Sequence, residues 1–291
     1  MHSGCIKWVF VLLAVFVNGN IQALEWPLPD SVVSRNFGYN DRGKPVLGTS
    51  LKGEGAILAA GDGVIIFSVS ENDTASRLPS PLGAWTAIDH DDGLISIYSR
   101  YLDGKQNEES LYAEQAMPVA TAGVSGWSEN CGLYFVLYDR IEHRWINTSM
   151  VINPLPDTMP PQILGIQLRN SGGKLLEGSQ LRNLSQGRYT IIINAIDTML
   201  SQKEEYLAPN KILCFVNGTE AGILSFDTIC ARDGVLLVNR NGLIPAATVY
   251  APYPAWEAGE VFLNRGQAIL EILVSDITGN SGSVQIRMLV E

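Results

Sequence analysis

The chain has 291 residues, of which 46% are hydrophobic and 17% charged, and its formal net charge is −10 at pH 7. These proportions are typical of a folded globular protein. The acidic balance argues against binding to nucleic acid or to anionic lipid, because both depend on clustered Lys and Arg side chains.

The N-terminus has the pattern of a secretory signal peptide. Lys7 precedes the apolar run 8–17, and Ala23 offers a small residue at a plausible cleavage site. The run is shorter than the roughly 20 residues that a membrane span needs. Cys5 lies before the run, so a lipid-anchored cysteine is not expected. We therefore expect residues 1–23 to be removed and the mature chain to be exported across the inner membrane, to the periplasm or outside the cell, without a stable membrane anchor.

The remaining sequence predicts a mostly β protein. Short β-branched or aromatic runs recur, as in residues 64–69, 189–196 and 268–277, and Gly, Asn, Asp and Pro separate them. Runs of this length with such punctuation are typical of β-strands. A sustained helical period is missing from the sequence.

The best domain boundary is the segment 153–163, which contains four prolines. Proline lacks a backbone donor and fixes φ, so no regular element should cross this segment. We expect one domain over residues 24–156 and a second over 157–291. The second ends with a strand, a polar turn and a final strand, which is typical of an immunoglobulin-like or fibronectin-like β-sandwich. That pattern predicts a fold and carries no function.

Three cysteines follow the expected signal peptide: Cys131, Cys214 and Cys230. An odd number allows at most one internal bridge. Cys214 and Cys230 flank two strand-like stretches that could lie side by side, and an oxidising compartment would permit a bond worth about 3 kcal/mol. We expect this disulfide, with Cys131 as a small buried apolar residue; three free thiols are the alternative.

Five segments of the first domain occur in an order that resembles a known family. They are FGYN (37–40), GAILAAGDGVI (55–65), IDHDDGLISIYSRYL (88–102), AGVSG (122–126) and GLYF (132–135). In this order they resemble the LytM/lysostaphin-type zinc endopeptidases, which cut peptidoglycan cross-bridges. The resemblance covers roughly residues 31–156 and implies a LytM/lysostaphin-like β-sheet domain there.

The resemblance also implies where zinc would bind, and the chain departs from the family at each of those positions. In the family a His, an Asp four residues later and the second His of an HLHF motif hold the metal. Aligned through Gly48, Val46 takes the first position, Ser50 the second and Tyr134 the third. Valine has no lone pair, and serine is a poor zinc ligand beside a carboxylate. We expect neither a metal nor another cofactor.

The catalytic histidines that the family uses are replaced as well. Arg100 stands at one position and Gly132 at the other. A guanidinium cannot serve as a base near neutral pH. The expected mature chain has only two histidines, His90 and His143, which is fewer than the family's ligands and catalytic groups require together.

These replacements predict a non-catalytic LytM-like protein of a bacterial cell envelope, a pseudo-metallopeptidase. It would bind peptidoglycan or an envelope protein, such as a cell-wall hydrolase that it regulates. Two alternatives stay open. One is an active peptidoglycan metalloendopeptidase with a site rebuilt from His90 and His143 with Asp89 or Asp139, which lack a recognised ligand spacing. The other is a purely structural envelope scaffold.

Arg100, Tyr134 and Trp127 are the candidates to line the former substrate groove. Together Arg100 and Tyr134 would form a cationic, hydrogen-bonding floor suited to a carboxylate. In the alternative interpretation, Arg100 pairs with a neighbouring Asp and Tyr134 only fills the space that the metal would occupy. Trp127 lies in a polar loop and is the best candidate for an exposed aromatic contact.

Overall fold

The structure is a computed structural model that describes residues 23–70, 80–102, 111–128, 130–199, 205–251 and 254–291. The expected signal peptide, apart from Ala23, lies outside the described residues. Strands dominate the described chain, so the predicted mostly β class is confirmed. The two described α-helices, α1 (Thr148–Val151) and α2 (Ala246–Val249), have four residues each. No described helix has the length and hydropathy of a membrane span.

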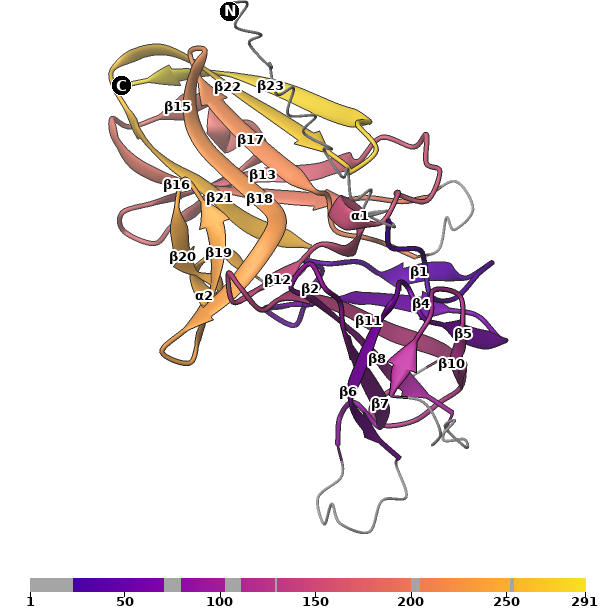
Figure 1. Cartoon of the computed structure of the whole chain (residues 1–291). Coiled ribbons are helices and arrows are strands. Elements are labelled where there is room, and N and C mark those ends of the chain that lie inside the picture. The colour runs from indigo at the N-terminus through magenta and orange to yellow at the C-terminus, as the bar shows by residue number, and fades with distance from the viewer. Residues whose placement is uncertain (1–22, 71–79, 103–110, 129, 200–204, 252–253) are drawn as a thin grey trace, which may run out of the picture.

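An antiparallel sheet carries the first half of the chain, residues 24–156 (Figure 1). In order across the sheet its strands are β1 (Val32–Arg35), β4 (Thr49–Lys52), β11 (Gly132–Asp139), β8 (Leu94–Tyr101), β7 (Ala84–Asp89), β6 (Gly63–Val69) and β9 (Tyr112–Ala113). Two short ladders accompany it: β2 (Asn40–Asp41) with β3 (Lys44–Pro45), and β5 (Ala56–Leu58) with β10 (Pro118–Thr121).

The core of the first half packs against this sheet and holds its central strands in register. Ile57, Ile88, Tyr98, Phe135 and Leu137 are fully buried in it. The rings of Tyr98 on β8 and Phe135 on β11 have centroids 5.2 Å apart. Because side chains alternate between the two faces of a strand, burying one face of β11 directs the other face outward.

Two facing sheets make up the second half, residues 157–291 (Figure 1). One has the order β15 (Asn183–Leu184), β23 (Ser281–Val290), β22 (Gly266–Ser275), β17 (Lys211–Val216) and β18 (Thr219–Arg232), with β19 (Val235–Arg240) and β20 (Leu243–Pro245) beyond β18. The other has the order β14 (Leu175–Glu177), β13 (Gln162–Asn170), β16 (Gly187–Ile196) and β21 (Ala255–Leu263). A 3-10 helix, η1 (Gly178–Arg182), leads into β15.

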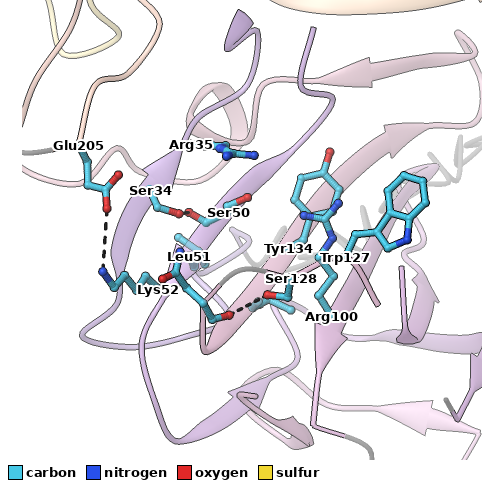
Figure 2. Close-up of a pocket in the computed structure, with 12 residues that line it drawn as sticks. Ser34, Arg35, Ser50, Leu51, Lys52, Arg100, Trp127, Ser128, Tyr134 and Glu205 are labelled. Carbon is cyan, nitrogen blue, oxygen red and sulfur yellow. Dashed lines mark hydrogen bonds and ion pairs between the residues drawn. The ribbon is translucent and has the colours of Figure 1, made fainter. Parts of the chain in front are cut away.

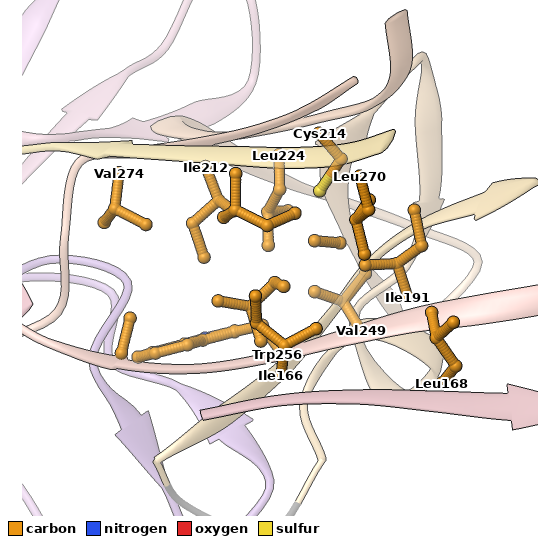
Figure 3. Packing of buried hydrophobic residues seen from close by; sticks show 14 of the residues in the cluster. Ile166, Leu168, Ile191, Ile212, Cys214, Leu224, Val249, Trp256, Leu270 and Val274 are labelled. Carbon is orange, nitrogen blue, oxygen red and sulfur yellow. The ribbon is translucent and has the colours of Figure 1, made fainter. Parts of the chain in front are cut away.

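Apolar side chains from both sheets meet between them (Figure 3). Ile166 and Ile191 come from one sheet, and Ile212 and Leu270 come from the other. Trp256 on β21 is fully buried in the same cluster. This two-layer arrangement is what the sequence led us to expect, while the immunoglobulin-like assignment stays a prediction.

The two halves share a sheet and exchange core residues. β12 (Arg144–Ile146) pairs with β11 on one side and with residues 228–230 of β18 on the other. Phe37 packs in the core of the second half, and Leu207 packs in that of the first. Residues 152–161, which include the four prolines, hold no strand or helix, as their composition predicted. The domain boundary at 156/157 itself stays a prediction.

The predicted disulfide between Cys214 and Cys230 is wrong. Cys214 pairs with Gly222 across the β17–β18 ladder, whereas Cys230 lies eight residues further along β18. At about 3.3 Å per residue that offset is roughly 25 Å, far beyond the ~7 Å between Cα atoms that a disulfide tolerates. All three described cysteines are free. Cys131, expected to be buried, is half-buried, and burial raises the pKa of the Cys214 thiol to about 12.

We expect thiol titration of the protein without residues 1–23 to give three thiols per chain after denaturation without reductant, because all three cysteines are free. In the folded protein, Cys214 should stay unreactive because it is buried and its thiolate is disfavoured. A count of one thiol after denaturation would restore the disulfide and contradict the register of β17 and β18.

Candidate functional site

A pocket opens on the first half, beside the ladder between β4 and β11 (Figure 2). β1, β4, β8 and β11 each contribute to its lining, as do Trp127, Ser128 and Asn130 and one residue of the second half. Its charged lining residues are Arg35, Lys52, Arg100 and Glu205. The predicted groove residues Arg100, Tyr134 and Trp127 all line it, and so does Ser50.

The register of two strands places part of this lining. β4 pairs with β11 so that Ser50 is opposite Tyr134 and Lys52 is opposite Gly132. Residues two apart on a strand share a face, so Ser50 and Lys52 project to the same side. Between them, Leu51 is buried in the core of the first half. The polar face of the ladder is therefore fixed by burial of its apolar face.

Arg100 and Tyr134 stack on each other at the pocket. The guanidinium carbon of Arg100 lies 4.6 Å from the centroid of the Tyr134 ring, a cation–π contact (Figure 2). Arg100 has a φ of 65° and its backbone N–H donates to the Leu82 carbonyl at 2.8 Å. Burial raises the pKa of the Tyr134 hydroxyl to about 12, while the charge of Arg100 acts in the opposite direction. The pair thus presents a fixed cation beside a neutral hydroxyl at physiological pH.

Lys52 and Glu205 belong to the pocket but escaped the sequence interpretation. The Nζ atom of Lys52 lies 3.9 Å from Oε1 of Glu205. A signal for Lys52 existed only in its spacing, because it follows Ser50 by two residues and would share its face on any strand. No signal existed for Glu205, since only the tertiary fold brings this residue of the second half to β4.

Two of the predicted positions lie outside the pocket lining. Val46 exchanges backbone hydrogen bonds with Gly38 and Tyr39, at 2.8 and 2.9 Å, next to the β2–β3 hairpin. Gly132 lies at the start of β11, where an added Cβ would overlap the backbone carbonyl oxygen of Leu51. No side chain fits at position 132 of this backbone, so the histidine that the resemblance places there could not be accommodated without a backbone shift.

His90 is a structural residue of the core. It is 5% exposed, its Nδ1 lies 2.7 Å from the carbonyl oxygen of Asp62, and its Nε2 lies 2.9 Å from Oγ of Ser96. Both ring nitrogens therefore have hydrogen-bond partners, and neither is directed at solvent or at the pocket. The chain of hydrogen bonds continues from Ser96 to the hydroxyl of Tyr98 at 3.0 Å.

The other residues of the rebuilt-site alternative are His143 in the turn after β11, Asp139 at the end of β11 and Asp89 at the end of β7. His143 is exposed, and Asp139 pairs with Arg144 at 3.3 Å. Asp89 pairs with Arg140 at 3.0 Å. Among the described residues, these side chains form no group with the geometry of a metal site.

A different group of carboxyls does converge, at a second pocket of the structure. One oxygen each of Asp157, Asp197 and Asp276 lies within 4.8 Å of the others. Asp276 accepts hydrogen bonds from the Thr278 hydroxyl at 3.0 Å and the Asn280 backbone at 2.9 Å. Burial first, and then the charges of Asp276 and Asp157, raise the pKa of Asp197 to about 8. At neutral pH Asp197 therefore keeps its proton.

Comparison with known proteins gives weak likenesses. A family model matches residues 160–291, which is less than half of the chain. An uncharacterized protein of Treponema pallidum (strain Nichols) is 28% identical over 137 residues, covering 42% of this chain and 93% of that protein.

Similar solved structures include peptidases and one complex. The SpoIIQ–SpoIIIAH pore forming complex matches with a TM-score of 0.35 and 16% identity, over 45% of this chain and 90% of that one. The catalytic domain of lysostaphin from Staphylococcus simulans matches with a TM-score of 0.30 and 16% identity, over 36% and 77%. A zinc containing peptidase from Vibrio cholerae matches with a TM-score of 0.37 and 18% identity, over 46% and 41%. At 14–19% identity these likenesses do not show a family for this chain, so the family resemblance stays a prediction.

Proposed function

We propose that this chain is an exported, non-catalytic LytM-like protein of a bacterial cell envelope, and that its pocket beside β4 and β11 binds a ligand without cutting it. One observation carries the proposal: the pocket brings together Ser50, Arg100 and Tyr134, three residues that stand where the resemblance puts metal-binding or catalytic groups. None of these side chains supplies the imidazole or carboxylate ligands of a hydrolytic zinc site. All three can form hydrogen bonds to a bound polar ligand.

The surroundings of the pocket support binding to an envelope component. Trp127 is 73% exposed and lies on the pocket rim. Exposed tryptophan is a common anchor at protein interfaces, because its large rigid ring loses little entropy on contact. Peptidoglycan and an envelope protein, such as a cell-wall hydrolase, are the ligands that the proposal names. A purely structural scaffold would leave this pocket unused.

Co-sedimentation with purified peptidoglycan sacculi tests the proposal. The protein without residues 1–23 should sediment with the sacculi, and Trp127→Ala should reduce the bound fraction several-fold, since the substitution removes an anchor worth about 1–2 kcal/mol. Phe262→Ala is the matched control, because Phe262 is a 54% exposed aromatic on the second half. If sacculi retain nothing, capture of an envelope hydrolase by wild type and not by the Trp127 variant remains the supporting result. If the protein binds neither sacculi nor a hydrolase, the result would favour the purely structural scaffold.

The same samples test the loss of catalysis. We expect no stoichiometric zinc and no release of new amines from cross-linked peptidoglycan, because the pocket lacks a zinc ligand set. About one zinc per chain, removed by chelator with loss of stability, would overturn this expectation. Amine release that survives repurification and disappears in His143→Ala would point to the rebuilt site instead.

A further inference from the structure

The charge of the pocket differs in sign from that of the whole chain. Three cations, Arg35, Lys52 and Arg100, line it together with one carboxylate, Glu205. The chain as a whole carries a formal net charge of −10. A local excess of positive charge in an acidic protein attracts an anionic group to this place in preference to the rest of the surface.

Neutral donors complete the chemistry of an anion site. The Tyr134 hydroxyl stays protonated, because burial raises its pKa to about 12, and Ser50 lies opposite it across the β4–β11 ladder. The Arg100 guanidinium is held against the Tyr134 ring, so its direction is restricted before any ligand arrives. Charged and neutral donors of this kind suit the two oxygens of a carboxylate.

The pocket already contains one carboxylate, that of Glu205, which is paired only weakly with Lys52. Oε1 of Glu205 lies 3.9 Å from Nζ of Lys52, and the two side chains are 37% and 51% exposed. Exposed ion pairs at this distance contribute little to stability. Glu205 thus gives Lys52 a carboxylate partner, as Figure 2 shows, and a ligand carboxylate with additional contacts could replace it.

We propose that this pocket is a receptor for a peptide carboxylate, and that the ligand carboxylate displaces Glu205 from Lys52 while Arg100 and Tyr134 hold the ligand. This inference rests on the proposed function and specifies its ligand chemistry. Trp127 lies at the rim, where the peptide backbone or side chains next to the carboxylate would contact its exposed ring. Glu205 then acts as an internal competitor that keeps non-specific anions out.

Three capped peptides separate the sources of the carboxylate. N-acetyl-trialanine carries a free terminal carboxylate, its C-terminal amide carries none, and an amidated acetyl peptide with a central glutamate carries one on a side chain. Binding is followed by NMR shift changes at about 10 mM peptide, well above a weak Kd of about 1 mM. We expect the first or the third peptide to bind and the plain amide not to bind.

Variants of the two ion-pair partners test the displacement. Glu205→Gln should tighten binding by up to about fivefold, because the competitor is removed. Lys52→Met should weaken it by about tenfold, because a charged hydrogen bond is lost. Lys174→Met, in an exposed turn of the second half, is the matched control and should change nothing.

Equal binding of the plain amide, or no binding of either carboxylate peptide to Glu205→Gln, would overturn the inference. So would an unchanged affinity in both Glu205→Gln and Lys52→Met. The proposed function is scored separately by the sacculi and hydrolase experiments. If the protein binds sacculi or a hydrolase but binds the capped peptides equally with and without a carboxylate, the inference is refuted and the proposed function still stands.

Discussion

Replacing Asp197 with Asn should make the protein more stable at pH 8 to 9 and should flatten the pH dependence of its unfolding free energy. Asp197 is 5% exposed and shares its site with Asp157 and Asp276. Its pKa is raised from 3.8 to about 8, first by burial and then by the two neighbouring carboxylates. Asparagine has the same shape and cannot ionise, so it keeps the packing and removes the titration.

The direction of the effect follows from proton linkage. The folded protein keeps the Asp197 proton up to about pH 8, whereas the unfolded chain gives it up near pH 3.8. The stability that this group contributes is therefore fully present below pH 3.8, and it is lost as the pH rises through the folded pKa. Between pH 3.8 and about pH 8, the Asp197 carboxyl alone should make the unfolding free energy fall by up to about 1.4 kcal/mol per pH unit.

Urea unfolding at a series of pH values between 4 and 9 measures this slope. Asp233→Asn is the matched control, because Asp233 is exposed in the turn between β18 and β19 at a φ of 51°, which asparagine also tolerates. The control should keep the wild-type slope. A parallel profile for Asp197→Asn, or a variant that is less stable than wild type at pH 9, would contradict the proton-holding cluster.

Replacing Gly222 with Ala should destabilise the protein by about 3 kcal/mol, the upper end of the usual cost of overpacking. Gly222 on β18 faces Gly259 on β21, where the backbones of the two sheets of the second half are in close contact. An added Cβ at position 222 would overlap the carbonyl oxygen of Ala258 and lie 2.7 Å from the Cα of Gly259. Both are backbone atoms, so relief requires the sheets to separate.

Gly165→Ala on β13 separates this contact from the general effect of losing a strand glycine. The nearest atom to a Cβ there is 3.7 Å away, on the Asn194 side chain. That variant should be neutral or slightly more stable, since alanine lowers the entropy of the unfolded chain. Both variants are compared by urea unfolding. Similar free energies for the two would show that the sheets do not meet at Gly222.

Local patterns predicted the strands well, and their ends less well. The apolar runs at 64–69 and 189–196 became β6 and β16, with ends within two residues. The run at 268–277 became β22, which ends at Ser275. Asp276 leaves the strand because its carboxylate accepts hydrogen bonds from Thr278 and Asn280, and these bonds form a turn. The alternation of side chains carries no information about such a competing turn.

Local sequence patterns predicted the β class and the strand-free proline segment. The family resemblance nominated Arg100, Tyr134 and Trp127 as groove residues and Ser50 as a former metal-ligand position, and all four line one pocket. Period-two patterns and proline act within a few residues, so they can be read along the chain. The site positions came from the five segments that resemble the LytM/lysostaphin-type family and occur in the same order.

Which distant strands pair, and in which register, could be seen only in the folded chain. The register separates Cys214 from Cys230, and the tertiary fold brings Glu205 to Lys52 and places Asp157 and Asp276 beside Asp197. Each of these results depends on contacts between residues far apart in the chain, and their free energy comes from packing within the second half and between the two halves. The spacing and composition of residues along the chain do not specify individual long-range contacts of this kind.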